Sequence, residues 1–304
     1  MSSVNKASAA ATVRKYPKRR QAGRPWYKPE VLVGWIFLAF MLLYALVPMA
    51  WMLSTSFKSQ FSALQQPPVW IPSEPSLEQY RILLSPYNEV GASFLRYLLN
   101  SLWVSTATTI LGVLVAVPAA YAFSRFNFPG KNALFFSILV RNMFPLVVFL
   151  IPLFILMRNL GLVNTHWSLI ITYLTFGLPL SIWLLKGFYD NIPPQLEQAA
   201  RIDGATRFQA FILIVMPLSS PGIIATAIYA FIQAWNEYVY AVTFLNSERL
   251  LTLPVGLQRF FSEYSTNWPG LMAASFIMSV PVVVLFLVLQ KYFVRALTEG
   301  AIKT

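Results

Sequence analysis

Six long apolar runs constrain the fold of this chain more than any other feature of its sequence. A helix that crosses a bilayer needs roughly 20 mostly apolar residues, and each run is close to that length or above it. Six such runs in a soluble bundle would leave no water-facing surface, so we predict an all-α integral membrane protein with its membrane domain at residues 31–290. Prolines inside the runs are compatible with spans, because neighbouring helices satisfy the freed carbonyls. The predicted spans lie near residues 31–53, 97–123, 133–157, 167–185, 222–245 and 271–290.

The composition supports this class and excludes several kinds of site. Of the 304 residues, 57% are hydrophobic and 11% are charged, whereas about 25% of residues are charged in soluble domains. Cysteine is absent and His166 is the one histidine. A disulfide framework, a thiolate nucleophile and a Cys/His zinc site are therefore excluded, and we expect no metal site, no cofactor bound by this chain and no enzymatic reaction.

The sequence lacks a nucleotide-binding loop. The P-loop pattern GxxxxGK[ST] is approached at NFPGKN, residues 127–132, but Arg125 stands where the first Gly belongs and Asn132 follows the Lys. We interpret this segment as a turn between helices, so ATP and Mg²⁺ would have to be bound by a partner.

The basic residues predict the orientation. The N-terminal segment 1–30, the loops 124–132 and 186–221, and the tail 291–304 carry 16 Lys and Arg residues, whereas the loops 54–96, 158–166 and 246–270 carry 6. Because cytoplasmic loops carry the excess of Lys and Arg, we expect both termini and the loop 186–221 in the cytoplasm. Residues 1–30 are interpreted as a disordered basic tail facing lipid, not as a cleaved signal or a nucleic-acid-binding segment.

Two charges fall inside predicted spans, Arg141 and Glu237. Placing either charged side chain against lipid costs about 2.5 to 3.5 kcal/mol, so each is expected to face protein or a water-filled path. The alternative is a charge near the interface that snorkels outward. The two depths roughly allow an Arg141–Glu237 pair. Trp235 and Asn236 adjoin Glu237, and this combination of aromatic ring, amide and carboxylate suits either a sugar pathway or helix packing. The candidate pathway residues are Arg141, Trp235, Asn236 and Glu237.

A dense polar insert, EQAARIDGATRFQAFILIVMP at residues 197–217, interrupts the apolar sequence. Two prolines at 193 and 194 suit the start of a helix, Gly204 permits the left-handed turn that ends it, and Thr206 can cap the next helix. We predict a helix, a turn and a second helix on the cytoplasmic face. Ala199 and Ala200 would let another backbone approach closely, which is typical of a docking site, although such loops also serve as connectors.

This insert resembles the EAA loop of ATP-binding-cassette (ABC) importer permeases, in which Glu-Ala-Ala is followed by Gly and then by Ile-x-Leu-Pro. Gln198 stands where that family has Glu, next to Glu197, and Met216 stands where it has Leu, a mild change in volume and polarity. The matching positions are Gln198, Ala199, Ala200, Gly204, Ile214, Met216 and Pro217.

The wider chain is similar to the second permease subunit of carbohydrate importers of the maltose, maltodextrin or trehalose type. The segments that carry the likeness are AAYAFSRFNFPGK, IPLFILMRNLGLVNTHWSLI, WNEYVYAVTFL, TLPVGLQRFF and LQKYFVRALTEGAIKT. The resemblance implies the six-span, MetI-like permease fold of type I importers in a bacterial or archaeal inner membrane. It also implies a homologous second permease, a dimer of ABC ATPase and an extracytoplasmic sugar-binding protein as partners.

By the same resemblance, the loop 186–221 docks on the ATPase. The coupling residues implied are Glu197, Gln198, Ala199, Ala200, Asp203, Gly204 and Arg207. The loop 246–270 reaches the binding protein by this resemblance, with interfacial anchoring by Tyr264 and Trp268 as the alternative.

Two other functions stay open for the whole chain. One is a permease for another solute such as glycerol phosphate or an amino acid, and the other is an ion-coupled secondary transporter.

Overall fold

The computed structural model of the chain describes residues 29–261 and 266–301. These residues are helical apart from loops and an isolated bridge between Phe261 and Thr266, which confirms the all-α class. The basic tail predicted at the N-terminus falls mainly on residues 1–28, outside the described residues, and so does Tyr264. The α-helices are α1 (Pro29–Ser56), α2 (Gln60–Ala63), α3 (Glu78–Leu84), α4 (Glu89–Arg125), α5 (Lys131–Val140), α6 (Leu150–Asn159), α7 (His166–Asn191), α8 (Pro194–Ile202), α9 (Arg207–Ala210), α10 (Met216–Leu218), α11 (Ser220–Trp235), α12 (Val239–Phe244), α13 (Leu253–Gly256) and α14 (Trp268–Ala301).

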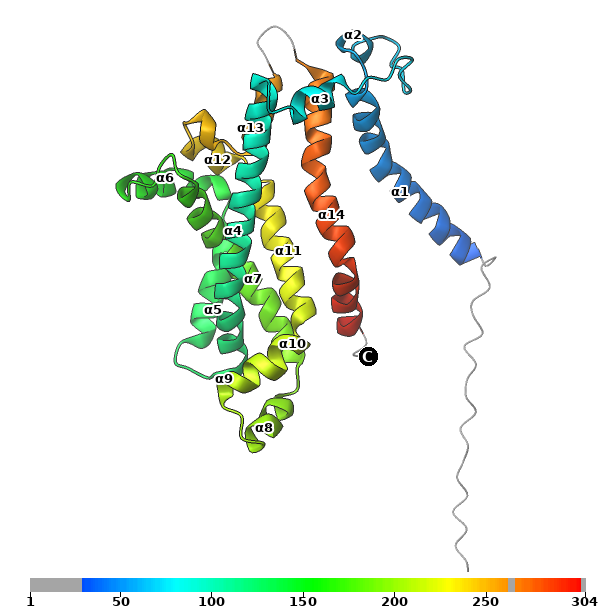
Figure 1. The fold of residues 1–304 in the computed structure, drawn as a ribbon. Helices are drawn as coiled ribbons and strands as arrows, with labels where there is room; N and C mark the ends of the chain where they lie inside the picture. Colours follow the sequence, from blue (N-terminus) through cyan, green and yellow to red (C-terminus); the bar gives the residue numbers. More distant parts are fainter. Residues whose placement is uncertain (1–28, 262–265, 302–304) are drawn as a thin grey trace, which may run out of the picture. The chain divides into compact units, whose positions relative to one another are not determined.

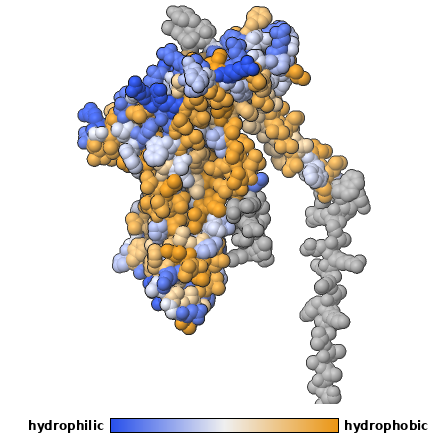
Figure 2. Space-filling model, in the orientation of Figure 1, coloured by the Kyte–Doolittle hydropathy of each residue, from blue (hydrophilic) through white to orange (hydrophobic). Residues whose placement is uncertain are grey.

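The chain divides into two compact units, residues 1–49 and 50–304. The first unit contains most of α1, which is long and apolar enough to cross a membrane. The second unit holds the remaining helices (Figure 1). On its visible face, hydrophobic residues cover the middle of the helices and hydrophilic residues gather toward the ends, as expected for a protein that crosses a bilayer (Figure 2).

Within the described residues, four unbroken helices could each cross a membrane, at Val31–Ser56, Glu89–Arg125, His166–Asn191 and Trp268–Gln290. Two further pairs of helices reach the same length but are bent. The pair Lys131–Met143 and Leu146–Asn159 is bent by 103°, and the pair Arg207–Leu218 and Ser220–Trp235 by 74°. The described residues therefore contain up to six candidate spans by length and composition, of which two are broken.

The third predicted span, residues 133–157, is not the single helix that the apolar run suggested. Helix α5 passes into a 3₁₀ turn, η1 (Arg141–Met143), and the chain is extended at Phe144 before Pro145. A residue before proline is pushed out of the helical region by the proline ring. A second 3₁₀ turn, η2 (Leu146–Phe149), then leads into α6. Prolines 48, 118, 179 and 281, by contrast, lie inside continuous helices.

The fifth predicted span, residues 222–245, also differs from the structure. Helix α11 ends at Trp235, and Asn236 caps it with its backbone N–H bonded to the carbonyl of Ile232. The short helix α12 then begins after a break at residues 236–238. Polar residues at the break hydrogen-bond to backbone groups, so the chain can interrupt the helix at this point.

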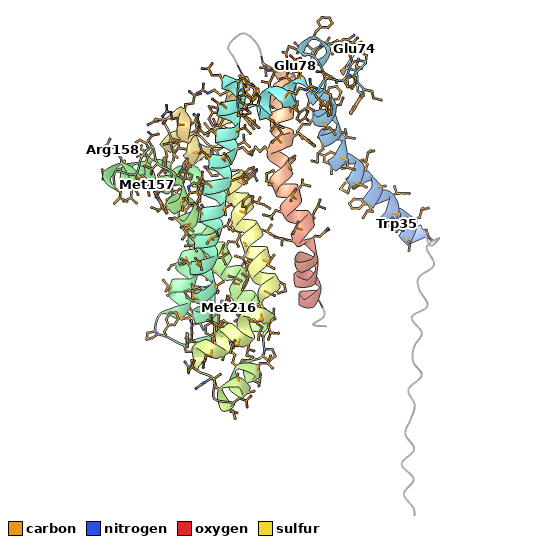
Figure 3. All side chains as sticks on the ribbon, viewed as in Figure 1. Trp35, Glu74, Glu78, Met157, Arg158 and Met216 are labelled. Carbon is orange, nitrogen blue, oxygen red and sulfur yellow. The ribbon has the colours of Figure 1, made fainter. Side chains whose placement is uncertain are left out.

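The second unit is held together by α4 and α7, which pack along each other, and by α11, which packs against both. One buried cluster joins these helices to α6 and α12, and includes Leu169, Tyr240 and Phe244. A second cluster lies nearer α8, and includes Ala120 and Tyr189. Figure 3 shows Met157 and Arg158 on α6; Met157 is buried and Arg158 is exposed.

Helix α11 approaches α7 closely at Gly222. A Cβ at this position would lie 2.4 Å from the ring of Phe188. Such overlap requires the ring to move, at a cost of about 1 to 3 kcal/mol. Gly187 lies one residue earlier on α7 and has no atom within 4 Å of an added Cβ.

We therefore expect Gly222→Ala to lower the thermal unfolding temperature of the detergent-purified protein. Gly187→Ala is expected to leave the temperature unchanged or to raise it, since alanine is the better helix former. Equal unfolding temperatures for the two variants would show that the close approach at Gly222 does not constrain the packing.

Candidate functional site

The polar insert forms the predicted helix, turn and second helix. Helix α8 begins at Pro194, and Gly204 adopts a left-handed φ of +96° just after it ends. Thr206 and Gln209 form a reciprocal capping box at the start of α9, with Gln209 N donating to Thr206 Oγ1 at 3.2 Å and Thr206 N donating to Gln209 Oε1 at 2.8 Å. A π-helical turn, η3 (Phe211–Val215), then connects α9 to α10. The local structure predicted from the turn and capping residues is thus confirmed.

One face of this insert is exposed and mixes polar with apolar groups. Ile202 is 85% exposed and Phe208 is 69% exposed, although both are large and apolar. Exposed apolar side chains rimmed by polar residues are typical of protein interaction sites. We call this exposed set the docking face; it consists of Gln198, Ala199, Arg201, Ile202, Asp203, Gly204, Arg207 and Phe208.

Glu197 points in the opposite direction, into the protein. Its carboxylate is buried and accepts a bond from Arg125 Nε at 2.6 Å and another from the Tyr121 hydroxyl at 2.6 Å. Arg125 Nη2 also donates to the carbonyl of Ile192 at 2.8 Å. The sequence placed Glu197 among the docking residues; in the structure its side chain binds α4 instead. Nothing in the sequence linked Arg125 and Tyr121 to Glu197.

The other predicted coupling residues lie at or near the surface. Ala200 is half-buried beside the exposed Ala199. Arg207 is exposed, with its guanidinium 5.4 Å from the ring centroid of Phe126.

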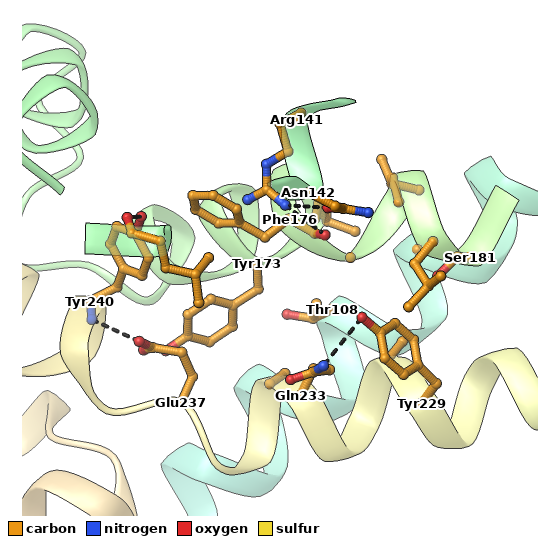
Figure 4. A pocket seen from close by; sticks show the side chains of 18 of the residues that line it. Thr108, Arg141, Asn142, Tyr173, Phe176, Ser181, Tyr229, Gln233, Glu237 and Tyr240 are labelled. Carbon is orange, nitrogen blue, oxygen red and sulfur yellow. Dashed lines mark hydrogen bonds between the residues drawn. The ribbon is translucent and has the colours of Figure 1, made fainter. Parts of the chain in front are cut away.

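A cavity of about 380 Å³ lies between α4, α7, α11 and the break after α5 (Figure 4). Figure 4 shows Arg141 on one side and Gln233, Tyr229 and Glu237 on the other. The cavity has an apolar wall with a few polar groups, the usual character of a small-molecule site. Its polar lining residues are Thr108, Arg141, Asn142, Tyr173, Ser181, Tyr229, Gln233, Glu237 and Tyr240.

Arg141 is held at the break by aromatic and carbonyl groups. Its guanidinium carbon lies 3.4 Å from the ring centroid of Phe176, and Nη1 donates to the Phe176 carbonyl at 3.2 Å and to Asn142 Oδ1 at 2.7 Å. Its Nη2 is buried without a hydrogen-bond partner. An unpaired donor of this kind is costly, and it leaves capacity for one more acceptor.

Glu237 lies in the break between α11 and α12 and binds the first turn of α12 and α7. Its carboxylate accepts bonds from the Tyr173 hydroxyl at 2.7 Å and from the backbone N–H groups of Tyr240 at 2.8 Å and Ala241 at 3.2 Å. Over the residues that the structure describes, no ion pair joins Glu237 to Arg141. The two charges line the same cavity but do not form the pair that their depths had allowed.

Trp235 and Asn236 do not line the cavity. Trp235 is 1% exposed, stacks on Phe231 and donates its indole N–H to the Met278 carbonyl at 3.1 Å. Asn236 is exposed and its amide donates to the Ile232 carbonyl at 3.0 Å. In this conformation Trp235 packs inside the bundle and Asn236 caps α11, which fits the helix-packing alternative for these two residues.

Most polar cavity residues were not predicted from the sequence, and Tyr229 and Gln233 are two of them; Gln233 Nε2 donates to the Tyr229 hydroxyl at 3.2 Å. With Glu237 they recur at intervals of four residues, so they lie on one face of α11 and its continuation. This spacing could have predicted them. Trp235, Asn236 and Glu237 are consecutive, and consecutive residues of a helix point in different directions, so they cannot all line one cavity.

The loop 246–270 packs on the end of α4 opposite α8. Asn100 Nδ2 donates to the carbonyls of Arg249 at 3.0 Å and Leu251 at 2.9 Å, and Leu253 N donates to Ser101 Oγ at 2.7 Å. Arg259 pairs with Glu248 at 3.1 Å. A hollow of about 820 Å³ lies here, with Arg96, Arg249 and Arg259 among its lining residues.

Comparison with known families gives a match over most of the chain. The family described as "Binding-protein-dependent transport system inner membrane component" matches residues 109–299. This segment contains α8, the docking face, the cavity residues Arg141 and Glu237, and the loop 246–270.

Two of the similar proteins match over most of the chain. The trehalose transport system permease protein SugB of Mycobacterium tuberculosis is 36% identical, over 86% of this chain and 93% of its own. The trehalose/maltose transport system permease protein MalG of Thermococcus litoralis is also 36% identical, over 90% of this chain and 96% of its own.

The fold has a counterpart among solved structures. A chain of a bacterial ABC transporter involved in the import of the acidic polysaccharide alginate superposes with a TM-score of 0.76 and 24% identity, over 89% of this chain and 100% of that chain. The likeness shows the MetI-like fold.

Proposed function

The chain belongs to the family of binding-protein-dependent transport system inner membrane components, and we propose that it is one of two permease subunits of an ATP-driven sugar importer. The observation that carries the proposal is the docking face, which α8, the following turn and the start of α9 expose within the segment that the family matches. The trehalose and maltose permeases among its relatives support a sugar of the maltose, maltodextrin, trehalose or related oligosaccharide class.

The proposed orientation places α8 and both termini in the cytoplasm of a bacterium or archaeon, with several spans in the inner membrane. The excess of Lys and Arg in the loop 186–221 and in both terminal segments supports it. In this orientation the loop 246–270 and its arginine-lined hollow lie outside the membrane, where a sugar-binding protein would dock.

The proposed complex contains this chain, a homologous second permease and a dimer of ABC ATPase, surrounded by membrane lipid. Residues Gln198 to Gly204 and Arg207 would seat in the ATPase, with Ile202 and Phe208 supplying apolar contact. The ATPase would bind ATP and Mg²⁺, and this chain would contribute no catalytic group.

Transport would proceed by alternating access. Closure of the ATPase dimer would move α8, and the bundle would rock so that the cavity beside Arg141 and Glu237 changes the side on which it opens. A site of equal affinity in both states shifts nothing, so ATPase docking and binding-protein contact must each favour one state. The apolar wall and dispersed polar groups of the cavity suit the faces and hydroxyls of a sugar.

The function is tested by reconstituting the chain in proteoliposomes with the second permease, the ATPase and the binding protein of the proposed importer. Radiolabelled maltose and trehalose are expected to accumulate only with ATP inside the vesicles and binding protein on the opposite side. Accumulation driven by an ion gradient without ATP would instead support the secondary-transporter alternative. ATP-driven uptake of glycerol phosphate in place of either sugar would correct the substrate class alone.

A further inference from the structure

A buried ion pair fastens α8 to the end of α4. The side chains of Arg125 and Glu197 are 13% and 11% exposed, and the distance between Nε and Oε1 is 2.6 Å. Tyr121, one turn earlier on α4, donates its hydroxyl to the other carboxylate oxygen at 2.6 Å. Both oxygens of Glu197 therefore bind the same helix, in a setting where charge-assisted bonds are strong.

Arg125 also fixes the point where α8 begins. Its Nη2 donates to the carbonyl of Ile192, which precedes Pro193 and the first turn of α8, while its Nε holds Glu197 within that helix. The planar guanidinium thus binds α8 at Glu197 and, through the Ile192 carbonyl, the segment that leads into α8. A lysine could not reproduce this fork.

The helix that receives these contacts also forms one wall of the cavity. Helix α4 is continuous from Glu89 to Arg125 and stays helical through Pro118. Thr108 and Gly112 on α4 line the cavity, and at 1.5 Å per residue Gly112 lies about 20 Å along the helix from Arg125. Near its other end, Asn100 and Ser101 bind the loop 246–270.

We propose that the Arg125–Glu197 pair is the mechanical connection through which movement of α8 is passed to α4 and so to the cavity wall. Elsewhere α8 is joined to the bundle through residues 192–193 and the turn 203–206, and through packing on α9 and η3. The ion pair adds a direct contact between α8 and α4, so that α4 follows α8 when α8 moves toward it or away from it. The inference rests on the proposed function, because α8 moves only if an ATPase moves it.

The test is Glu197→Gln in the reconstituted importer, with the number of sugar molecules imported per ATP hydrolysed as the readout. We expect this ratio to fall by at least about fivefold, the low end of the usual coupling between distant sites, while ATP hydrolysis continues. A variant that merely lowers the amount of folded complex would lower uptake and hydrolysis together and leave the ratio unchanged.

Asp190→Asn is the matched control. It removes a carboxylate at the same end of the bundle, where Asp190 pairs with Lys186 at 2.6 Å and accepts from Ser124 at 2.7 Å. These contacts join α7 to itself and to α4 but do not include α8, so the ratio is expected to stay at the wild-type value. An equal loss of coupling in both variants would overturn the proposal.

Arg125→Lys decides the question if Glu197→Gln does not assemble. It keeps the positive charge but cannot bind Glu197 and the Ile192 carbonyl together as the guanidinium does, so the ratio is expected to fall, and a wild-type ratio would overturn the proposal. A wild-type complex that imports sugar without ATP would refute the proposed function itself. ATP-driven import with a normal ratio in Glu197→Gln would refute this inference alone.

Discussion

Replacing Gly204 with leucine is expected to reduce ATP-driven uptake by about tenfold or more, which corresponds to roughly 1.4 kcal/mol or more of lost interaction, while the protein still inserts into the membrane. Gly204 has a φ of +96°, and a Cβ there meets no atom within 4 Å. The fold would bear a backbone strain of about 1 to 2 kcal/mol. The leucine side chain would project from the docking face and obstruct close approach of the ATPase.

Gly130→Leu is the control that distinguishes obstruction of ATPase docking from backbone strain at a left-handed residue. Gly130 also has a left-handed φ, +77°, and open space around it, but it lies in the turn between α4 and α5. We expect this variant to keep most of its uptake and to co-purify with the ATPase, whereas Gly204→Leu loses the ATPase on purification. Retention of the ATPase and of full uptake by Gly204→Leu would contradict the docking role of this face.

Replacing Arg141 with alanine is expected to lower uptake by about tenfold or more, since hydrogen bonds to charged groups are worth about 1.5 to 3 kcal/mol each. The substitution removes the contact with the Phe176 ring, the bond to the Phe176 carbonyl and the one to Asn142. The break after α5 would then lose its polar contacts with α7, and the cavity would lose the Arg141 cation.

Arg141→Lys distinguishes charge from geometry. Lysine keeps the positive charge but lacks the planar fork, so a partial loss of uptake is expected if both contribute. Arg158→Ala removes an exposed arginine on α6, and uptake per assembled complex should stay at the wild-type level. Full activity of Arg141→Ala, measured per assembled complex, would show that Arg141 is a charge tolerated at the membrane surface.

Much of the fold could be predicted because the bilayer restricts what a chain can do. Apolar length marked the spans, and Gly204 and Thr206 marked the turn and the cap of the insert. The broken spans could not be predicted in this way. Pro118 and Pro145 look alike in an apolar run, yet one lies in a continuous helix and the other follows an extended residue. Which proline interrupts a helix depends on the neighbours that satisfy its carbonyls.

The candidate site shows the same division. Arg141 and Glu237 were recognisable because charge is costly at membrane depth, and both line the cavity. The direction of Glu197 was not recognisable, because its partner Arg125 lies 72 residues away in the sequence. The residue type alone marked Arg141 and Glu237 as candidates, whereas the partner of Glu197 is decided by how α4 packs against the insert.

The π-helical turn η3 sets the rotation of α8 and α9 relative to α11. Residues Phe211–Val215 form a wider turn than an α-helix would, directly before the Met216–Pro217 pair. Each residue of an α-helix turns the chain by about 100°, so removing one residue from η3 would rotate α8 and α9 by that angle relative to α11. The docking face would then point away from its present direction, and Glu197 could no longer reach Arg125. The spacing of ten positions from Gly204 to Ile214 therefore sets the rotation of α8 and α9 about the helix axis as well as their distance from α11.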